Sequence, residues 1–147
     1  MIAVVDSGTK GFFWQIDSHC LNKCATNDGI KVNLPDGSII RSTHTAELNV
    51  HQLPMTARKV YLFPELKKSL ISISQLSDSV YMSLFDGEKV FAMKDMTVGL
   101  QGMRNQNRLY MIDLKTNVSK TYNNFKSIPL KIYKQTIAYM QLNQKKR

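Results

Sequence analysis

The chain has 147 residues, of which 43% are hydrophobic and 21% are charged, the composition of an ordinary globular protein. Its length predicts one domain that can bury a core without disulfides or metals. No apolar run approaches the roughly 20 residues that a membrane-spanning helix needs, which argues against a membrane protein. No basic region precedes the first apolar residues, so we expect a buried strand there, no signal peptide and a cytoplasmic location.

The net charge of +9 is concentrated at one end of the chain. Residues 1–103 carry ten basic and ten acidic side chains, whereas residues 104–147 carry ten basic ones and a single acid, Asp113. We therefore expect a neutral folded body, residues 1–114, and a basic tail, residues 115–147. Such a tail can contact RNA or DNA through phosphate groups or can be a solvated linker, and the charge leaves both alternatives open.

The body, taken in chain order, is a series of short apolar runs separated by turn residues. The turns are Asn27-Asp28-Gly29, Pro35-Asp36-Gly37, Pro54, Pro64 and Asp86-Gly87. Short strands at this spacing predict an all-β sandwich or small closed barrel. Asp36-Gly37 predicts a hairpin whose tight two-residue loop needs positive φ angles, and Asp86-Gly87 predicts a second hairpin of the same kind.

Two segments favour helix instead of strand. Ser72 or Ser74 can cap a short helix of one or two turns near residues 73–79. In the tail, residues 115–127 are typical of a linker, and residues 130–143 carry a partial apolar stripe at helical spacing. We therefore expect a tail that is partly helical and otherwise disordered.

The cysteines and histidines could form a metal site or could be ordinary structural residues. A metal site would combine Cys20 and Cys24 with His19, and would need a fourth ligand from the distant His44 or His51. This spacing matches no common zinc motif. We therefore expect no metal and no cofactor. The cysteines are interpreted as small buried residues in a reducing compartment, and the other histidines as ordinary sheet residues.

The apolar and sulfur-containing side chains are interpreted as core. Residues 11–14, Gly-Phe-Phe-Trp, could stack on nucleic-acid bases, but four consecutive apolar residues after a turn favour burial. The methionines, including Met82, Met93, Met96 and Met103, are expected to fill the core.

Asp6 ends the first apolar run and is followed by Ser7, Gly8 and Thr9. These residue types suit an ordinary tight turn. They also suit one half of a pair of carboxylates that share a proton, in which one activates water and the other protonates a peptide carbonyl. Because the chain has one such turn, the second carboxylate would come from a second copy, in a homodimer.

Four segments in order carry a resemblance to a known family. They are VVDSGTKGFF, VNLPDGSIIRSTHTAELNV, VYLFPELKKSLISISQLSDSVYMSLFDGEKVFAM and GLQGMRNQNRLYMIDL. Together they resemble the protease region of copia-type LTR-retrotransposon Gag-Pol polyproteins, over roughly residues 2–114. The tail is similar to the start of the pre-integrase segment that follows in these polyproteins.

This resemblance implies a small closed retropepsin-like barrel with one short helix, active as a homodimer that cuts the Gag-Pol polyprotein inside a virus-like particle. It implies that Asp6 is the catalytic aspartate and that Ser7, Gly8 and Thr9 complete its loop. Only five residues precede Asp6, and we expect a domain that is short at its N-terminus relative to the family.

Two further elements are implied by the resemblance, a flap that covers substrate and a second loop behind the active site. The flap residues are Pro35, Asp36, Gly37 and Ser38. The second-loop residues are Leu70, Ile71 and Ser72. Ser72 stands where most retropepsins have glycine. The alternative function is an inactive β-barrel remnant that acts as a spacer or as a nucleic-acid-associated module.

Overall fold

The computed structural model describes residues 1–115, and these residues are mostly β-strand, as predicted. The strands are β1 (Ile2–Asp6), β2 (Phe12–Trp14), β3 (Cys20–Ala25), β4 (Lys31–Asn33), β5 (Ile39–Arg41), β6 (His44–Leu48), β7 (Lys59–Leu62), β8 (Ser69–Ser72), β9 (Met82–Phe85), β10 (Lys89–Lys94), β11 (Thr97–Arg104) and β12 (Tyr110–Asp113). The helices are the 3-10 helix η1 (Met55–Ala57) and the α-helix α1 (Ile73–Asp78). The predicted basic tail and its helix lie outside the described residues.

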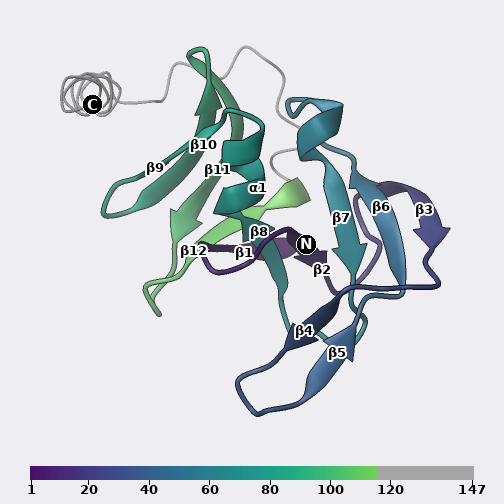
Figure 1. Ribbon diagram of the computed structural model, residues 1–147. Coiled ribbons are helices and arrows are strands. Elements are labelled where there is room, and N and C mark those ends of the chain that lie inside the picture. The colour runs from purple at the N-terminus through teal and green to yellow at the C-terminus, as the bar shows by residue number, and fades with distance from the viewer. Residues whose placement is uncertain (116–147) are drawn as a thin grey trace, which may run out of the picture.

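Ten of the strands form one sheet in the order β3-β6-β7-β2-β8-β1-β12-β11-β10-β9, and β4 pairs with β5 separately. Figure 1 shows β9, β10 and β11 on one side of β1 and β8, and β6 and β7 on the other. The expected closed barrel is not shown, because in residues 1–115 the two end strands, β3 and β9, are not paired with each other. A bulge between Leu21 and Cys24 bends β3, and such bulges limit further pairing at a sheet edge.

The core lies between the two halves of the sheet and contains the aromatic run that follows the first turn. Phe12 and Trp14 are fully buried, and their rings stack with centroids 6.0 Å apart. Phe13 points to a second, smaller cluster with Ile40, Phe63 and Leu66. The interpretation of residues 11–14 as core is therefore confirmed. Fully burying one such side chain contributes about 1.5–3 kcal/mol relative to leaving it exposed.

The short helix has the position and the cap that the sequence predicted. Ser72 is its N-cap, with an extended backbone, and the Ser72 hydroxyl accepts a hydrogen bond from the Gln75 amide. Leu76 is the buried residue of the helix. The helix therefore begins directly at the end of β8, which places its first turn beside the strand ends of the central sheet.

The hairpin between β4 and β5 forms, but its loop differs from the prediction. Leu34 N–H donates to Ser38 O at 2.8 Å and Gly37 N–H donates to Leu34 O at 2.9 Å, so the loop has three residues. Only Gly37 has a positive φ, 86°, because a three-residue loop requires one left-handed residue at its end. The predicted two-residue loop was therefore wrong, although Gly37 does supply a positive φ.

The predicted Asp86-Gly87 turn also forms by a different mechanism. Asp86 N–H donates to Lys89 O at 3.0 Å, so the loop residues are Gly87 and Glu88, and Gly87 is not in the left-handed region. Instead, the Asp86 carboxylate accepts hydrogen bonds from the Glu88 and Lys89 amides and closes the turn. These bonds hold the pKa of Asp86 below its usual value.

The turn between β10 and β11 explains why the prediction for the methionines was only partly right. Asp95 and Met96 have φ angles of 49° and 64°, as a two-residue hairpin loop requires, and the Met96 side chain is 63% exposed there. Met103 is also 63% exposed, near the end of β11. Met93 is buried and Met82 is half-buried, so these two do contribute to packing.

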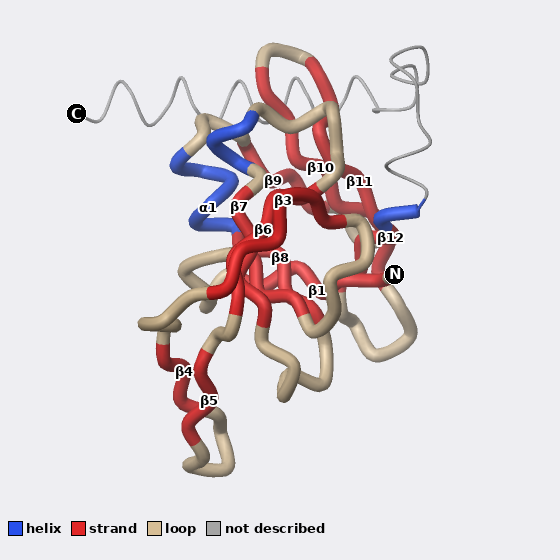
Figure 2. Tube along the Cα trace, turned by 90° about the vertical axis from the view of Figure 1, so that its right-hand side faces the viewer, coloured by secondary structure: helices blue, strands red, loops and turns tan. Residues whose placement is uncertain are grey.

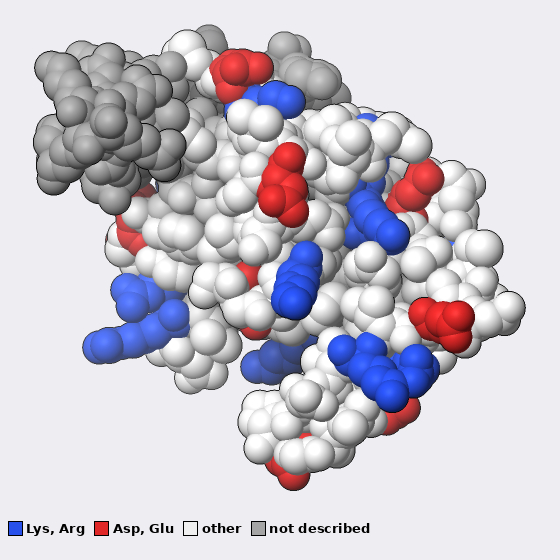
Figure 3. All heavy atoms as spheres, in the orientation of Figure 1, with Lys and Arg blue, Asp and Glu red and all other residues white. Residues whose placement is uncertain are grey.

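Among residues 1–115, no helix has the length and apolarity needed to cross a bilayer. Basic and acidic side chains are interspersed over the face shown in Figure 3, in agreement with the even charge balance of the body.

Gly102 tests the close pairing of β11 with β12. A Cβ atom at this position would lie 2.1 Å from the Met111 carbonyl oxygen, so Gly102→Ala is expected to lower the free energy of unfolding by about 1–3 kcal/mol in urea titrations. Gly87→Ala is the matched control, because a Cβ there has no heavy atom within 4 Å. Equal unfolding midpoints for the two variants would contradict the close packing of these strands.

Candidate active site

Asp6 lies at the C-terminal end of β1, in the middle of the ten-stranded sheet. β1 pairs with the parallel strand β8 on one side and with the antiparallel strand β12 on the other. The register places Asp6 opposite Ser72, the last residue of β8. Asp6 is half-buried, whereas Ser7 and Gly8 are exposed. The Asp6 carboxylate therefore lies at the junction between a partly buried strand, β1, and the exposed turn that follows it.

The Asp6 carboxylate is oriented by its own loop. Gly8 N–H donates to Asp6 Oδ1 at 2.6 Å. A Cβ on Gly8 would lie 3.2 Å from the same oxygen, so a larger residue would press on the carboxylate. This hydrogen bond is the one that an ordinary aspartate turn makes, and it also orients a carboxylate for chemistry. The bond therefore fixes the geometry of Asp6 without deciding between the two interpretations.

Ser72 holds the Asp6 loop from behind. Its side chain is fully buried, and its hydroxyl donates to Thr9 O at 2.7 Å while accepting from Gln75 N–H at 3.0 Å. The same oxygen thus caps α1 and secures the far end of the loop that begins at Asp6. Leu70, Ile71 and Ser72 lie on β8, so the residues predicted to form a second loop are the end of a strand that pairs beside β1.

Gln75 extends this support and was not singled out from the sequence as a site residue. Its Oε1 accepts from Phe12 N–H at 3.0 Å, and its Nε2 donates to Ala57 O and Lys59 O at 3.1 and 2.8 Å. The amide therefore links the strand after the Asp6 loop to η1 and β7. The S-x-x-Q spacing of Ser72 and Gln75 is a helix-start pattern that could have pointed to this residue.

The two hydroxyls expected in the catalytic loop have different surroundings. Ser7 is exposed. The Thr9 Oγ1 is buried and has no hydrogen-bond partner among the described residues. Of the two hydroxyl-bearing residues, only Ser7 is exposed at the surface.

The predicted flap residues lie at the exposed tip of the hairpin formed by β4 and β5, which extends away from the body (Figures 1 and 2). The Asp36 carboxylate accepts from the Ser38 hydroxyl at 2.5 Å and from the Ser38 amide at 2.9 Å, and these bonds lower the pKa of Asp36. The hydrogen bonds described for the tip are internal to the hairpin. The base of the hairpin is held by Ile40, whose side chain is buried in the smaller core cluster.

The cysteines are less buried than predicted, because both lie on the edge strand β3. Cys24 is exposed and Cys20 is half-buried against the core. Burial, and secondarily the negative charge of Asp17, raises the pKa of the Cys20 thiol to about 11. His44 lies on β6 with its Nδ1 2.8 Å from the Thr43 hydroxyl, while His51 is exposed in a turn. Within residues 1–115, no three His, Cys, Asp or Glu side chains are grouped as a metal site would require.

No protein-family model, no curated protein and no solved structure matches this chain.

Ser72→Ala tests whether the buried hydroxyl supports the Asp6 loop. The substitution removes a helix cap and leaves the Thr9 carbonyl without its donor, so the free energy of unfolding is expected to fall by about 2 kcal/mol. Urea unfolding followed by circular dichroism measures the change. Ser74→Ala, on the exposed side of the same helix, is the control and is expected to alter stability little.

Alkylation tests the surroundings of the two thiols. At pH 8, iodoacetamide is expected to modify Cys24 well before Cys20, because Cys20 is partly covered and stays protonated below its raised pKa of about 11. Peptide mass spectrometry at timed intervals identifies the modified residue. Faster labelling of Cys20 would contradict this placement of β3, and a Cys24→Ala variant isolates the slower reaction.

Proposed function

We propose that this chain is an aspartic endopeptidase that works as a homodimer, with Asp6 supplying one carboxylate per subunit. The observation that carries the proposal is the position of Asp6 at the end of a central strand, opposite Ser72 on a parallel strand, with an exposed Ser-Gly turn in front. The resemblance to copia-type protease regions supports it. The substrate would be the Gag-Pol polyprotein, cut in cytoplasmic virus-like particles.

The chemistry of two carboxylates explains why a second copy is needed. Two carboxylates about 3 Å apart cannot both ionise, so one stays protonated and can donate to the peptide carbonyl while the other activates water. The sequence has one Asp-Ser-Gly turn, so the second carboxylate comes from a partner chain. The exposure of Ser7 and Gly8 leaves this turn accessible to a partner, and the Gly8 amide holds one oxygen of the Asp6 carboxylate in place.

The proposed fold is a retropepsin-like subunit built around β1, β8 and α1. The hairpin of β4 and β5 has the features of a flap, since its tip is exposed and its base is held by Ile40. Movement of the tip over bound peptide would exclude water from the carboxylates. Contact of the basic tail with RNA or DNA is a further part of the proposal and falls on residues outside the described part.

Asp6→Asn is the direct test of the enzyme proposal. Cleavage of a Gag-Pol junction peptide is expected to fall by about 10²–10⁴-fold or to vanish, because the amide cannot take part in proton exchange. The fold is expected to remain, since the side-chain oxygen of the introduced asparagine still accepts from Gly8 N–H, and circular dichroism checks this. Asp28→Asn, at an exposed turn, is the matched control and is expected to retain activity.

Two further measurements complete the test. A statine-type transition-state mimic is expected to inhibit cleavage by the wild-type chain. Sedimentation is expected to show a dimer at high micromolar concentration. A strict monomer that cleaves nothing and ignores the inhibitor would overturn the protease proposal and leave the alternative of an inactive folded spacer.

A further inference from the structure

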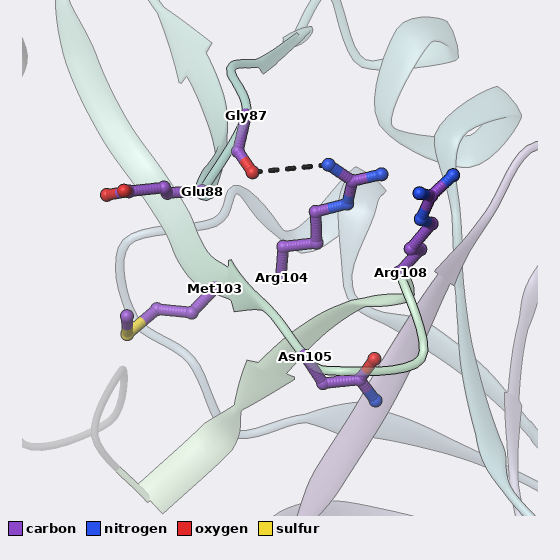
Figure 4. A pocket seen from close by; sticks show the side chains of 6 residues that line it. All are labelled: Gly87, Glu88, Met103, Arg104, Asn105 and Arg108. Carbon is purple, nitrogen blue, oxygen red and sulfur yellow. Dashed lines mark hydrogen bonds between the residues drawn. The ribbon is translucent and has the colours of Figure 1, made fainter.

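An open pocket of about 320 Å³ lies beside the turn that joins β9 to β10. Its lining residues are Gly87, Glu88, Met103, Arg104, Asn105 and Arg108 (Figure 4). They come from this turn, from the end of β11 and from the loop that follows it. Two guanidinium groups therefore share one hollow.

Arg104 is positioned by contacts that leave most of its donors free. Its Nη1 donates one long bond to Gly87 O at 3.4 Å, and its guanidinium carbon lies 5.7 Å from the centroid of the Tyr110 ring. Tyr110 is itself fixed, because its hydroxyl donates to Asp86 O at 2.5 Å. A guanidinium has five N–H donors, so Arg104 can bind an oxyanion without giving up these contacts.

Arg108 is held beside it by the backbone of its loop. Its φ of 62° lies in the left-handed region, which arginine rarely adopts. Three hydrogen bonds keep the loop in this form: Arg108 N–H to Asn105 O, Asn105 N–H to Leu109 O, and Leu109 N–H to Asn105 Oδ1. In Figure 4 the Arg104 and Arg108 guanidinium groups lie on the same side of this loop.

Within residues 1–115, neither arginine forms an ion pair with a carboxylate, although Asp86 and the pocket-lining Glu88 keep their negative charges nearby. The ion pairs described within residues 1–115 join Met1 to Asp113 and Lys23 to Asp17, and neither arginine takes part. The Asp86 carboxylate accepts hydrogen bonds from the amides of its own turn. The Glu88 carboxylate points away from both arginines in Figure 4. Two like charges held side by side favour the binding of an anion between them.

The pocket also lies at the same end of the sheet as Asp6. Val4 on β1 pairs with Met111 on the antiparallel strand β12. Because the two strands run in opposite directions, the end of β1 that carries Asp6 lies beside the end of β12 that carries Tyr110. Tyr110 is the residue over which Arg104 lies. Met103 also lines the pocket, but in Figure 4 its exposed side chain points away from both arginines.

We propose that Arg104 and Arg108 bind the carboxylate of an acidic side chain in an extended polypeptide. Planar guanidinium groups match a carboxylate, and one small hollow suits a single acidic group. A nucleic acid would require a longer basic track, whereas the charged residues that line this pocket are two basic ones, Arg104 and Arg108, and one acidic one, Glu88. The site does not depend on the protease proposal; if both hold, the acidic residue belongs to the polyprotein substrate.

The test uses the full chain carrying Asp6→Asn, so that peptide binding is measured without cleavage. A negative binding result would then leave the protease proposal unaffected. Two labelled extended peptides are compared by fluorescence anisotropy at low salt, one with a single central Glu and otherwise uncharged, the other with Gln in its place. The Glu peptide is expected to bind about fivefold more tightly. Arg104→Gln with Arg108→Gln is expected to abolish this difference.

The matched control is Lys145→Gln with Lys146→Gln, which removes the same charge from the tail and is expected to keep the preference. Should the double arginine variant lose its fold, Arg108→Gln alone, in an exposed loop, is expected to reduce the preference by itself. Equal binding of the two peptides, or equal loss in the tail variant, would overturn the proposal. Binding of inorganic phosphate or single-stranded RNA that depends on both arginines, without a preference for Glu, would overturn it too and assign the pocket to another anion.

Discussion

The buried Ser72 hydroxyl needs both a hydrogen-bond acceptor and a donor. The acceptor is the carbonyl of Thr9, 63 residues earlier in the chain, and the donor is the amide of Gln75, three residues later. Because a buried polar group without partners costs about 1–3 kcal/mol, the end of β8, the start of α1 and the Asp6 loop have to meet at this side chain. The parallel pairing of β8 with β1 then sets Asp6 opposite Ser72. The geometry of the candidate site depends on this junction.

Sequence patterns predicted what local chemistry determines. Ser72 at a helix start, the burial of Phe12 and Trp14, and the existence of hairpins at the two Asp-Gly pairs all follow from side chains acting within a few residues. The loop types did not follow. The loop at Asp36-Gly37 uses a positive φ at Gly37, whereas the loop at Asp86-Gly87 is closed by hydrogen bonds to the Asp86 carboxylate. The same dipeptide therefore gives two different turns.

The candidate site was predictable only in part, because its support comes from distant segments. The resemblance marked Asp6 and Ser72, but no local pattern says that Gln75 reaches Phe12 and the strand at Lys59. The pairing of Arg104 with Arg108 likewise needs the left-handed backbone at Arg108, which nothing in its sequence context favours. Strand order and register, not residue type, bring these groups together.

The place of β1 in the sheet has a consequence for how the protein comes to be folded. One of its two neighbours in the sheet, β12, ends at Asp113, more than a hundred residues later in the chain. Such long-range pairing is slow, and on the ribosome it has to wait until both strands have been made. Asp6 therefore reaches its final surroundings late in synthesis, and the carboxylate pair proposed for it could not assemble on an unfinished chain.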